Sequence, residues 1–137
     1  MKTHFVSLVV PLYNEEANVA KLYYEITSVM DAAGIRSEIV FVDDGSSDRT
    51  VENLVQAAEE DSRVKIVSFR RNFGQTAAMA AGFDYAQGDV IVTLDGDLQN
   101  DPAEIPRMIA KLDEGYDLVA GWRKNRQDAA ISRKLPS

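Results

Sequence analysis

The sequence predicts an α/β domain with a mostly parallel sheet and flanking helices. Short apolar runs, which suit buried strands, alternate with segments whose apolar residues recur every three or four positions, as on one face of a helix. The 137 residues are 45% hydrophobic, which is enough for one hydrophobic core in a chain too short for two comfortable domains. We therefore expect a single domain over residues 1–137.

The first half of the chain contains two expected strands and two expected helices. Phe5–Pro11 is nearly all apolar, which is typical of a strand covered on both faces. Asn14 is a candidate cap for the helix that follows, and Gly34 is placed to end that helix. Ile39–Val42 is the second strand, and Asp48 is a candidate cap for the second helix.

The second half continues the alternation. Val64–Phe69 is the third strand, and the helix expected at Gln75–Tyr85 is rich in small residues, which permits close packing on the sheet. Val90–Leu94 is the fourth strand. A helix start follows at Asp101–Glu104, where a capping carboxylate precedes a proline at the first helical position. Leu118–Ala120 is a short fifth strand.

The residues after Gly121 lack a strong period, and we expect a mobile loop there. Residues 123–137 contain five basic residues and one acid, so the rest of a chain whose net charge is −7 carries −11. An acidic body argues against nucleic acid as a partner, whereas a basic tail suits phosphate or an anionic lipid surface. The chain has no cysteine, which excludes disulfides and thiolate metal sites.

Polar residues follow every expected strand. Ligands of open parallel sheets bind outside the carboxyl ends of the strands. These ends carry the following residues here: Asn14-Glu15, Asp43-Asp44, Arg70-Arg71-Asn72, Asp95–Gln99 and Trp122-Arg123. The sequence therefore predicts a ligand site along one edge of the sheet.

Asp95 and Asp97 stand two residues apart on the turn that leaves the fourth strand. Carboxylates in this arrangement can hold a hard divalent cation whose open positions accept diphosphate oxygens. Gly96 between them permits close approach of the main chain to a ligand. A calcium loop of the EF-hand type does not fit, because Asn100 stands where it needs glycine and Pro106 where it needs glutamate.

Several other chemistries lack their residues. The phosphate-binding P-loop pattern is absent, and no Gly-x-Gly-x-x-Gly follows the first strand. His4 is the only histidine and precedes the first strand, so a Ser-His-Asp triad is excluded and His4 is expected to be an exposed terminal residue. A phosphoaccepting receiver domain carries its Asp-Asp pair after the first strand, whereas here the pair follows the second.

Four motifs together resemble family 2 glycosyltransferases of the GT-A fold, a Rossmann-like fold that binds nucleotide-diphospho-sugars. They are Val10-Pro11-Leu12-Tyr13-Asn14-Glu15, Val42-Asp43-Asp44-Gly45-Ser46-Ser47-Asp48, Asp95-Gly96-Asp97-Leu98-Gln99 and Gly121-Trp122-Arg123. Two further motifs are similar to the polyprenyl-phosphate branch of that family, which includes dolichol-phosphate mannose synthase and bactoprenol-phosphate glucosyltransferases: Arg71-Asn72-Phe73-Gly74-Gln75 and Leu98-Gln99-Asn100-Asp101-Pro102.

The resemblance implies a role for each residue of the nucleoside site. Pro11, Tyr13 and Glu15 are expected to hold the base and ribose, with the Tyr13 ring as a flat face and Glu15 accepting from ribose hydroxyls. Val42 and Asp44 are expected to complete the base pocket, with Asp44 accepting from a base N–H.

It also implies a metal and phosphate site. Asp95 and Asp97 are expected to bind Mg²⁺ or Mn²⁺ on the diphosphate, with Gln99 lining the same site. Arg123 and Arg133 are expected to contact phosphates of donor or acceptor, since a guanidinium matches a phosphate bidentately. We assign Asp97, Arg123 and Arg133 to catalysis, and Ser137 is expected beside Arg133.

The implied reaction is inverting transfer of a hexose from a nucleotide-diphospho-sugar to a polyprenyl phosphate. UDP-glucose is the first donor to consider, followed by GDP-mannose and UDP-N-acetylglucosamine. A lipid phosphate is already an anionic nucleophile at neutral pH, so it needs no catalytic base. Two alternatives stay open: a family 2 enzyme with a soluble or polysaccharide acceptor, and a non-catalytic nucleotide-binding module.

Members of this branch usually continue into amphipathic and often transmembrane helices, whereas this sequence stops at Ser137 and contains no stretch of about 20 apolar residues. No signal-peptide pattern follows Met1. We therefore expect a chain truncated at its C-terminus, from a protein that works at the cytoplasmic side of the cell membrane. The chain itself is expected to be soluble and able to form a homo-oligomer.

Overall fold

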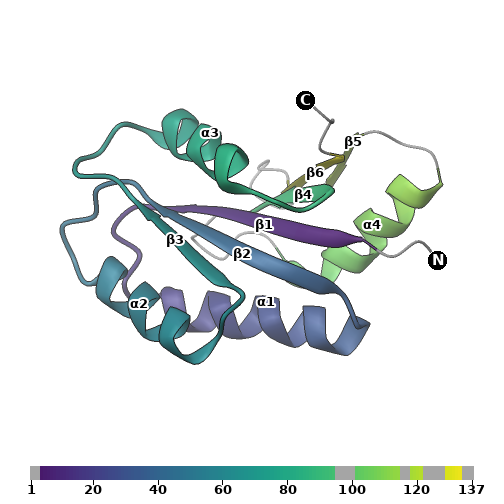
Figure 1. Cartoon of the computed structure of the whole chain (residues 1–137), viewed down its shortest axis with the longest axis horizontal. Coiled ribbons are helices and arrows are strands. Elements are labelled where there is room, and N and C mark those ends of the chain that lie inside the picture. The colour runs from purple at the N-terminus through teal and green to yellow at the C-terminus, as the bar shows by residue number, and fades with distance from the viewer. Residues whose placement is uncertain (1–3, 95–100, 115–117, 122–128, 134–137) are drawn as a thin grey trace.

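The computed structural model describes residues 4–94, 101–114, 118–121 and 129–133, the last two ranges by their main chain. Six strands form one sheet in the order β3-β2-β1-β4-β6-β5 (Figure 1). The strands are β1 Phe5–Leu12, β2 Arg36–Asp43, β3 Val64–Ser68, β4 Val90–Thr93, β5 Leu118–Gly121 and β6 Ala129–Arg133. The helices are α1 Val19–Ala33, α2 Thr50–Glu60, α3 Gln75–Tyr85, the 3₁₀ helix η1 Pro102–Glu104 and α4 Ile105–Asp113.

The first four strands are parallel, as predicted, and β1 lies between β2 and β4. The expectation of a loop after Gly121 is wrong for Ala129–Arg133, which form β6 and pair antiparallel with both β4 and β5. Five residues with two alanines give no clear period of two, so the sequence carried little signal for this strand.

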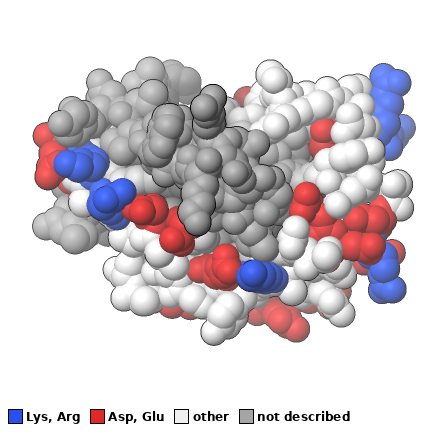
Figure 2. Space-filling view, turned by 180° about the vertical axis from the view of Figure 1, so that it is seen from behind, with Lys and Arg blue, Asp and Glu red and all other residues white. Residues whose placement is uncertain are grey.

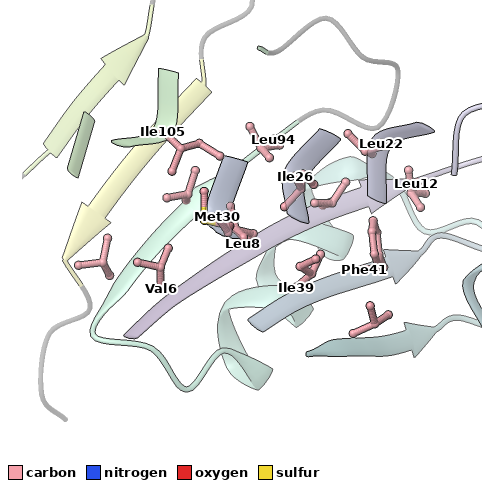
Figure 3. Packing of buried hydrophobic residues seen from close by; sticks show 14 of the residues in the cluster. Val6, Leu8, Leu12, Leu22, Ile26, Met30, Ile39, Phe41, Leu94 and Ile105 are labelled. Carbon is pink, nitrogen blue, oxygen red and sulfur yellow. The ribbon is translucent and has the colours of Figure 1, made fainter. Parts of the chain in front are cut away.

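The main hydrophobic core lies on one face of the sheet, beneath α1, α2 and α4. Alternate β1 side chains enter it, including Val6 and Leu8, and Phe41 of β2 lies beside them (Figure 3). Ile26 and Met30 of α1 are fully buried against these strands. Burial on both faces explains why β1 and β2 read as nearly continuous apolar runs.

Among the described helices, α3 is the one that packs on the other face, against β1 and β2. Its bounds, Gln75–Tyr85, are those predicted from the sequence. A Cβ at Gly82 would lie 2.3 Å from Val9 Cγ1, so only glycine permits this close approach of helix and strand. The small residues of α3 therefore serve packing, as the sequence suggested.

Three predicted caps have different outcomes. Asp101 accepts a hydrogen bond from the Ala103 N–H at 3.0 Å, so this cap is confirmed, although it opens η1 rather than an α-helix. Asp48 accepts from the first N–H of α2, on Thr50, at 2.9 Å. The prediction that Asn14 caps the first helix is wrong, because α1 begins only at Val19 and Asn14 binds a neighbouring loop instead.

His4 is not an exposed terminal residue, contrary to the sequence-based expectation. Its side chain is 8% exposed, and its two ring nitrogens lie 2.6 Å from Asp89 Oδ2 and 2.7 Å from Asp113 Oδ1. These two hydrogen bonds, first that to Asp113, raise the pKa of His4 above its ordinary value.

Among the described residues, no helix has both the length and the apolar character that a membrane crossing requires.

Candidate functional site

The carboxyl ends of β1 and β2 meet at one edge of the sheet, which we call the rim and define by residues 11–16, 42–48 and 70–74 together with Leu94. Leu12 pairs with Asp43, and the Asp44 N–H donates to the Leu12 carbonyl at 2.8 Å, so the two chain exits lie side by side. A group of acidic side chains gathers at the end of the molecule that carries the rim (Figure 2).

Tyr13 and Glu15 lie at the exit of β1, as predicted. The Tyr13 side chain is 48% exposed, which leaves a ring face available to a planar ligand. Glu15 Oε2 accepts from Asn18 Nδ2 at 2.7 Å, and no described residue donates to Oε1. The Glu15 N–H is fixed by Thr50 Oγ1 at 2.9 Å. Glu15 is therefore a held carboxylate with one open acceptor atom.

Pro11 and Val42 are brought together but are not exposed. They are paired neighbours in the β1–β2 register, and both are buried. Val42 belongs to the small core cluster under α3, with Val9 and Ala78. The side chains of Pro11 and Val42 are therefore part of the buried structure beneath the rim surface. Of the residues predicted to hold the base, Tyr13 is the one with an exposed apolar side chain.

Asp44 holds the loop between β3 and α3. Its Oδ1 accepts from the Phe73 N–H at 2.7 Å, and its Oδ2 accepts from the Gly74 N–H and from Asn72 Nδ2, each at 3.0 Å. A carboxylate has about four acceptor positions, so one remains for a ligand N–H. Sequence reasoning assigned Asp44 to ligand binding and missed this structural role.

Asp43 was predicted at this edge of the sheet beside Asp44, but without a role of its own. It is 1% exposed, its Oδ2 accepts from the Ser46 N–H at 3.2 Å, and its Oδ1 is a buried atom with no hydrogen-bond partner among the described residues. An unpartnered buried acceptor is costly, so it indicates a place where a ligand donor or water completes the bonding. Its position as the last residue of a buried strand was the available signal.

The predicted metal site lies outside the described residues. Asp95, Asp97 and Gln99 follow Leu94, which is 1% exposed and whose N–H donates to the Val9 carbonyl at 3.0 Å. That bond places Leu94, the last described residue before them, beside β1. Within the described part of the chain, no cluster of three His, Cys, Asp or Glu side chains could hold a metal ion.

The two predicted arginines follow different strands. Arg123 and Ser137 lie outside the described residues, although Gly121 at the end of β5 lies at the same edge as the end of β4. The main chain of Arg133 pairs with Val90, the first residue of β4, which puts it at the opposite edge of the sheet. The register therefore does not bring Arg133 to the rim, and its phosphate contact stays an untested prediction.

Residues 7–137 match the sequence model of a protein family described as glycosyl transferase family 2. The chain belongs to glycosyl transferase family 2. It is 48% identical to a dodecaprenyl-phosphate galacturonate synthase of Rhizobium johnstonii, over 96% of this chain and 40% of that protein. It is 47% identical to an undecaprenyl-phosphate 4-deoxy-4-formamido-L-arabinose transferase of Shewanella sediminis, over 97% of this chain and 40% of that protein. The chain thus spans about two fifths of the length of these relatives.

Solved structures of other glycosyltransferases share the fold. A mannosyltransferase of Pyrobaculum calidifontis, in complex with GDP-Man and Mn²⁺, matches with a TM-score of 0.80 at 18% identity, over 97% of this chain and 45% of that one. A glucosyl-3-phosphoglycerate synthase of Mycobacterium tuberculosis, in complex with Mn²⁺ and UDP, matches with a TM-score of 0.77 at 21% identity, over 95% and 57%. These matches confirm the predicted GT-A fold.

Proposed function

We propose that this chain is the donor-binding catalytic part of a glycosyltransferase that moves a hexose from a nucleotide-diphospho-sugar to a polyprenyl phosphate. The observation that carries the donor half is the rim, where an exposed aromatic ring and acceptor atoms without described donors lie at adjacent strand ends. The acceptor half rests on the two relatives described above, both named for a polyprenyl phosphate and both matching nearly all of this chain.

The nucleoside lies over the rim in this proposal. The ring of Tyr13 stacks on the base, and Glu15 Oε1 accepts from a ribose hydroxyl. Asp44 or Asp43 accepts the base N–H: Asp44 has one acceptor position left, and Asp43 Oδ1 is the buried atom without a partner. Arg123 contacts a phosphate of donor or acceptor.

The diphosphate lies over the exit of β4. Asp95 and Asp97 carry the oxygen ligands that Mg²⁺ and Mn²⁺ prefer, and they follow Leu94, which lies beside β1. A divalent cation bound there neutralises charge on the departing nucleotide. Gln99 lines the same site.

The acceptor supplies its own nucleophile. A polyprenyl phosphate is anionic at neutral pH, so the protein needs no side chain to deprotonate it. What the chain contributes is position and screening of two anions that repel each other. Family resemblance supports inversion at the anomeric carbon by one in-line displacement, at the cytoplasmic side of a membrane.

The nucleotide and the sugar are tested by a thermal-shift screen of UDP-glucose, GDP-mannose and UDP-N-acetylglucosamine, each with and without Mn²⁺. We expect one donor to raise the melting temperature by several degrees only when Mn²⁺ is present. Stabilisation by nucleotide without metal dependence would favour a non-catalytic module, and no stabilisation by any donor would contradict the proposal.

The acceptor is tested separately, by donor turnover with undecaprenyl phosphate and with undecaprenol as the matched control. We expect sugar transfer to the phosphate and none to the alcohol, because only the phosphate is ionised. Transfer to a soluble glycan, with none to the lipid phosphate, would favour the alternative acceptor class.

A further inference from the structure

Asn14 adopts a backbone conformation that side chains rarely take. Its φ is 51°, and it is the one non-glycine with positive φ in the described part of the chain. Asparagine tolerates the left-handed region better than most residues, but the region still costs free energy relative to extended backbone. Such a conformation persists where surrounding contacts hold it, so the contacts of Asn14 show what it serves.

Three hydrogen bonds join Asn14 to the loop after β2. The Asn14 N–H donates to Ser46 Oγ at 2.9 Å, the Ser47 N–H donates to Asn14 Oδ1 at 2.8 Å, and the Ser47 hydroxyl donates to the same oxygen at 3.4 Å. Each loop therefore donates to the other and accepts from it. We call these three bonds the loop clasp.

The loop clasp lies between the groups that the ligand must meet together. Tyr13 and Glu15 are the neighbours of Asn14 in the chain. On the other side, Ser46 also donates its N–H to Asp43 Oδ2 at 3.2 Å. A displacement of Asn14 would therefore change the spacing between the exposed ring and the buried carboxylate.

We propose that Asn14 is a positioning residue for nucleotide binding: its side-chain oxygen and its left-handed turn set the distance between the β1 exit and the β2 exit before the ligand arrives. The inference rests on the proposed function, since it concerns the same nucleotide site. It assigns Asn14 no contact with the ligand. A site organised in advance binds more tightly because less ordering is left to the binding step.

The test compares three substitutions by titration with UDP and with GDP, each in the presence of Mn²⁺. Asn14→Asp keeps an acceptor oxygen and tolerates the turn, so we expect affinity within about threefold of wild type. Asn14→Ala and Asn14→Gly both remove the acceptor, and we expect each to weaken binding about tenfold or more, which is a difference of about 1.4 kcal/mol. Asn14→Gly removes the backbone cost, so it separates the lost acceptor from strain.

Asn53→Ala is the matched control. It also removes a side-chain hydrogen bond to the segment after β1, that from Asn53 Nδ2 of α2 to the Glu16 carbonyl at 3.0 Å, and this bond involves neither Tyr13 nor Asp43. We expect Asn53→Ala to lower the melting temperature as Asn14→Ala does and to leave nucleotide affinity within twofold.

The outcomes are distinct. If wild type binds UDP or GDP while the alanine and glycine variants bind equally well, Asn14 is only structural and the inference is overturned. Equal weakening by Asn53→Ala and Asn14→Ala also overturns it, because the effect would then be general loosening. If wild type binds neither nucleotide with Mn²⁺, the proposed function fails and this inference fails with it.

Discussion

At the edge of the sheet opposite the rim, the His4 side chain lies between two carboxylates. His4 joins Asp89, just before β4, to Asp113 at the end of α4. Partial burial acts to raise the pKa of Asp89, but hydrogen bonds from His4 and the Phe5 N–H outweigh it and lower that pKa below the usual value. A charged imidazole between two carboxylates thus ties the first strand to the last described helix.

Stability should depend on pH through this histidine. Because the folded pKa of His4 is raised, its contribution is fully present below the unfolded value near 6.5 and is lost as pH rises through the folded pKa. Part of the contribution of His4 to stability is also lost at acid pH, because Asp89 is then protonated. We expect His4→Gln to reduce the free energy of unfolding by about 1 kcal/mol more at pH 5.5 than at pH 9, in urea denaturation. An equal loss at both pH values would contradict a charged His4.

Among the secondary-structure elements, α3 is placed by contacts that begin at the rim. Asp44 binds three donors of the segment just before the helix, and Gly45 lies so close to that segment that a Cβ would meet the Arg71 carbonyl carbon at 2.1 Å. The loop after β3 is thereby fixed against the loop after β2. Helix α3 follows directly and packs through Gly82 on Val9.

Removing the Asp44 carboxylate should loosen this arrangement. Asp44→Ala leaves the Phe73 and Gly74 N–H groups without their acceptor, while the Asn72 amide keeps its bond to the carbonyl of residue 44. We expect a loss of about 3 kcal/mol in the free energy of unfolding. Asp84→Ala, which removes an exposed acid of the same helix, should change it by no more than about 0.5 kcal/mol. Urea denaturation measures both variants. A comparable loss of unfolding free energy in the two would argue against the role of Asp44 in holding the segment before α3.

The elements differed in how well the sequence predicted them. Helix α3 has the bounds expected from the sequence, Gln75–Tyr85, and its small residues indicated its close packing on the sheet. The start of α1 was misplaced, because Asn14 suits a cap and a left-handed turn equally well and only the neighbouring Ser47 N–H decides between them. Strand β6 was missed because its five residues, Ala129–Arg133, show no alternation of apolar and polar side chains.

Across the described part of the molecule, one edge of the sheet gathers the residues that we propose for the nucleotide site, and the other edge holds the two hydrogen bonds of His4. Tyr13, Glu15 and Asp44 could be predicted together, because parallel strands bring their carboxyl ends to one edge. Arg133 could not be placed from sequence, since an antiparallel strand carries its end to the far edge. Asp43 needed the structure, because only burial reveals an acceptor atom without a partner.

We propose that Asp95 and Asp97 hold a divalent cation shared with a nucleotide diphosphate. Calorimetric titration of Mn²⁺ into wild type, Asp97→Asn and the control Asp84→Asn, each with and without UDP or GDP, tests this proposal. We predict that nucleotide tightens Mn²⁺ binding at least tenfold in wild type and in the control, and that Asp97→Asn abolishes this gain. Superimposable titration curves for wild type and Asp97→Asn would contradict it.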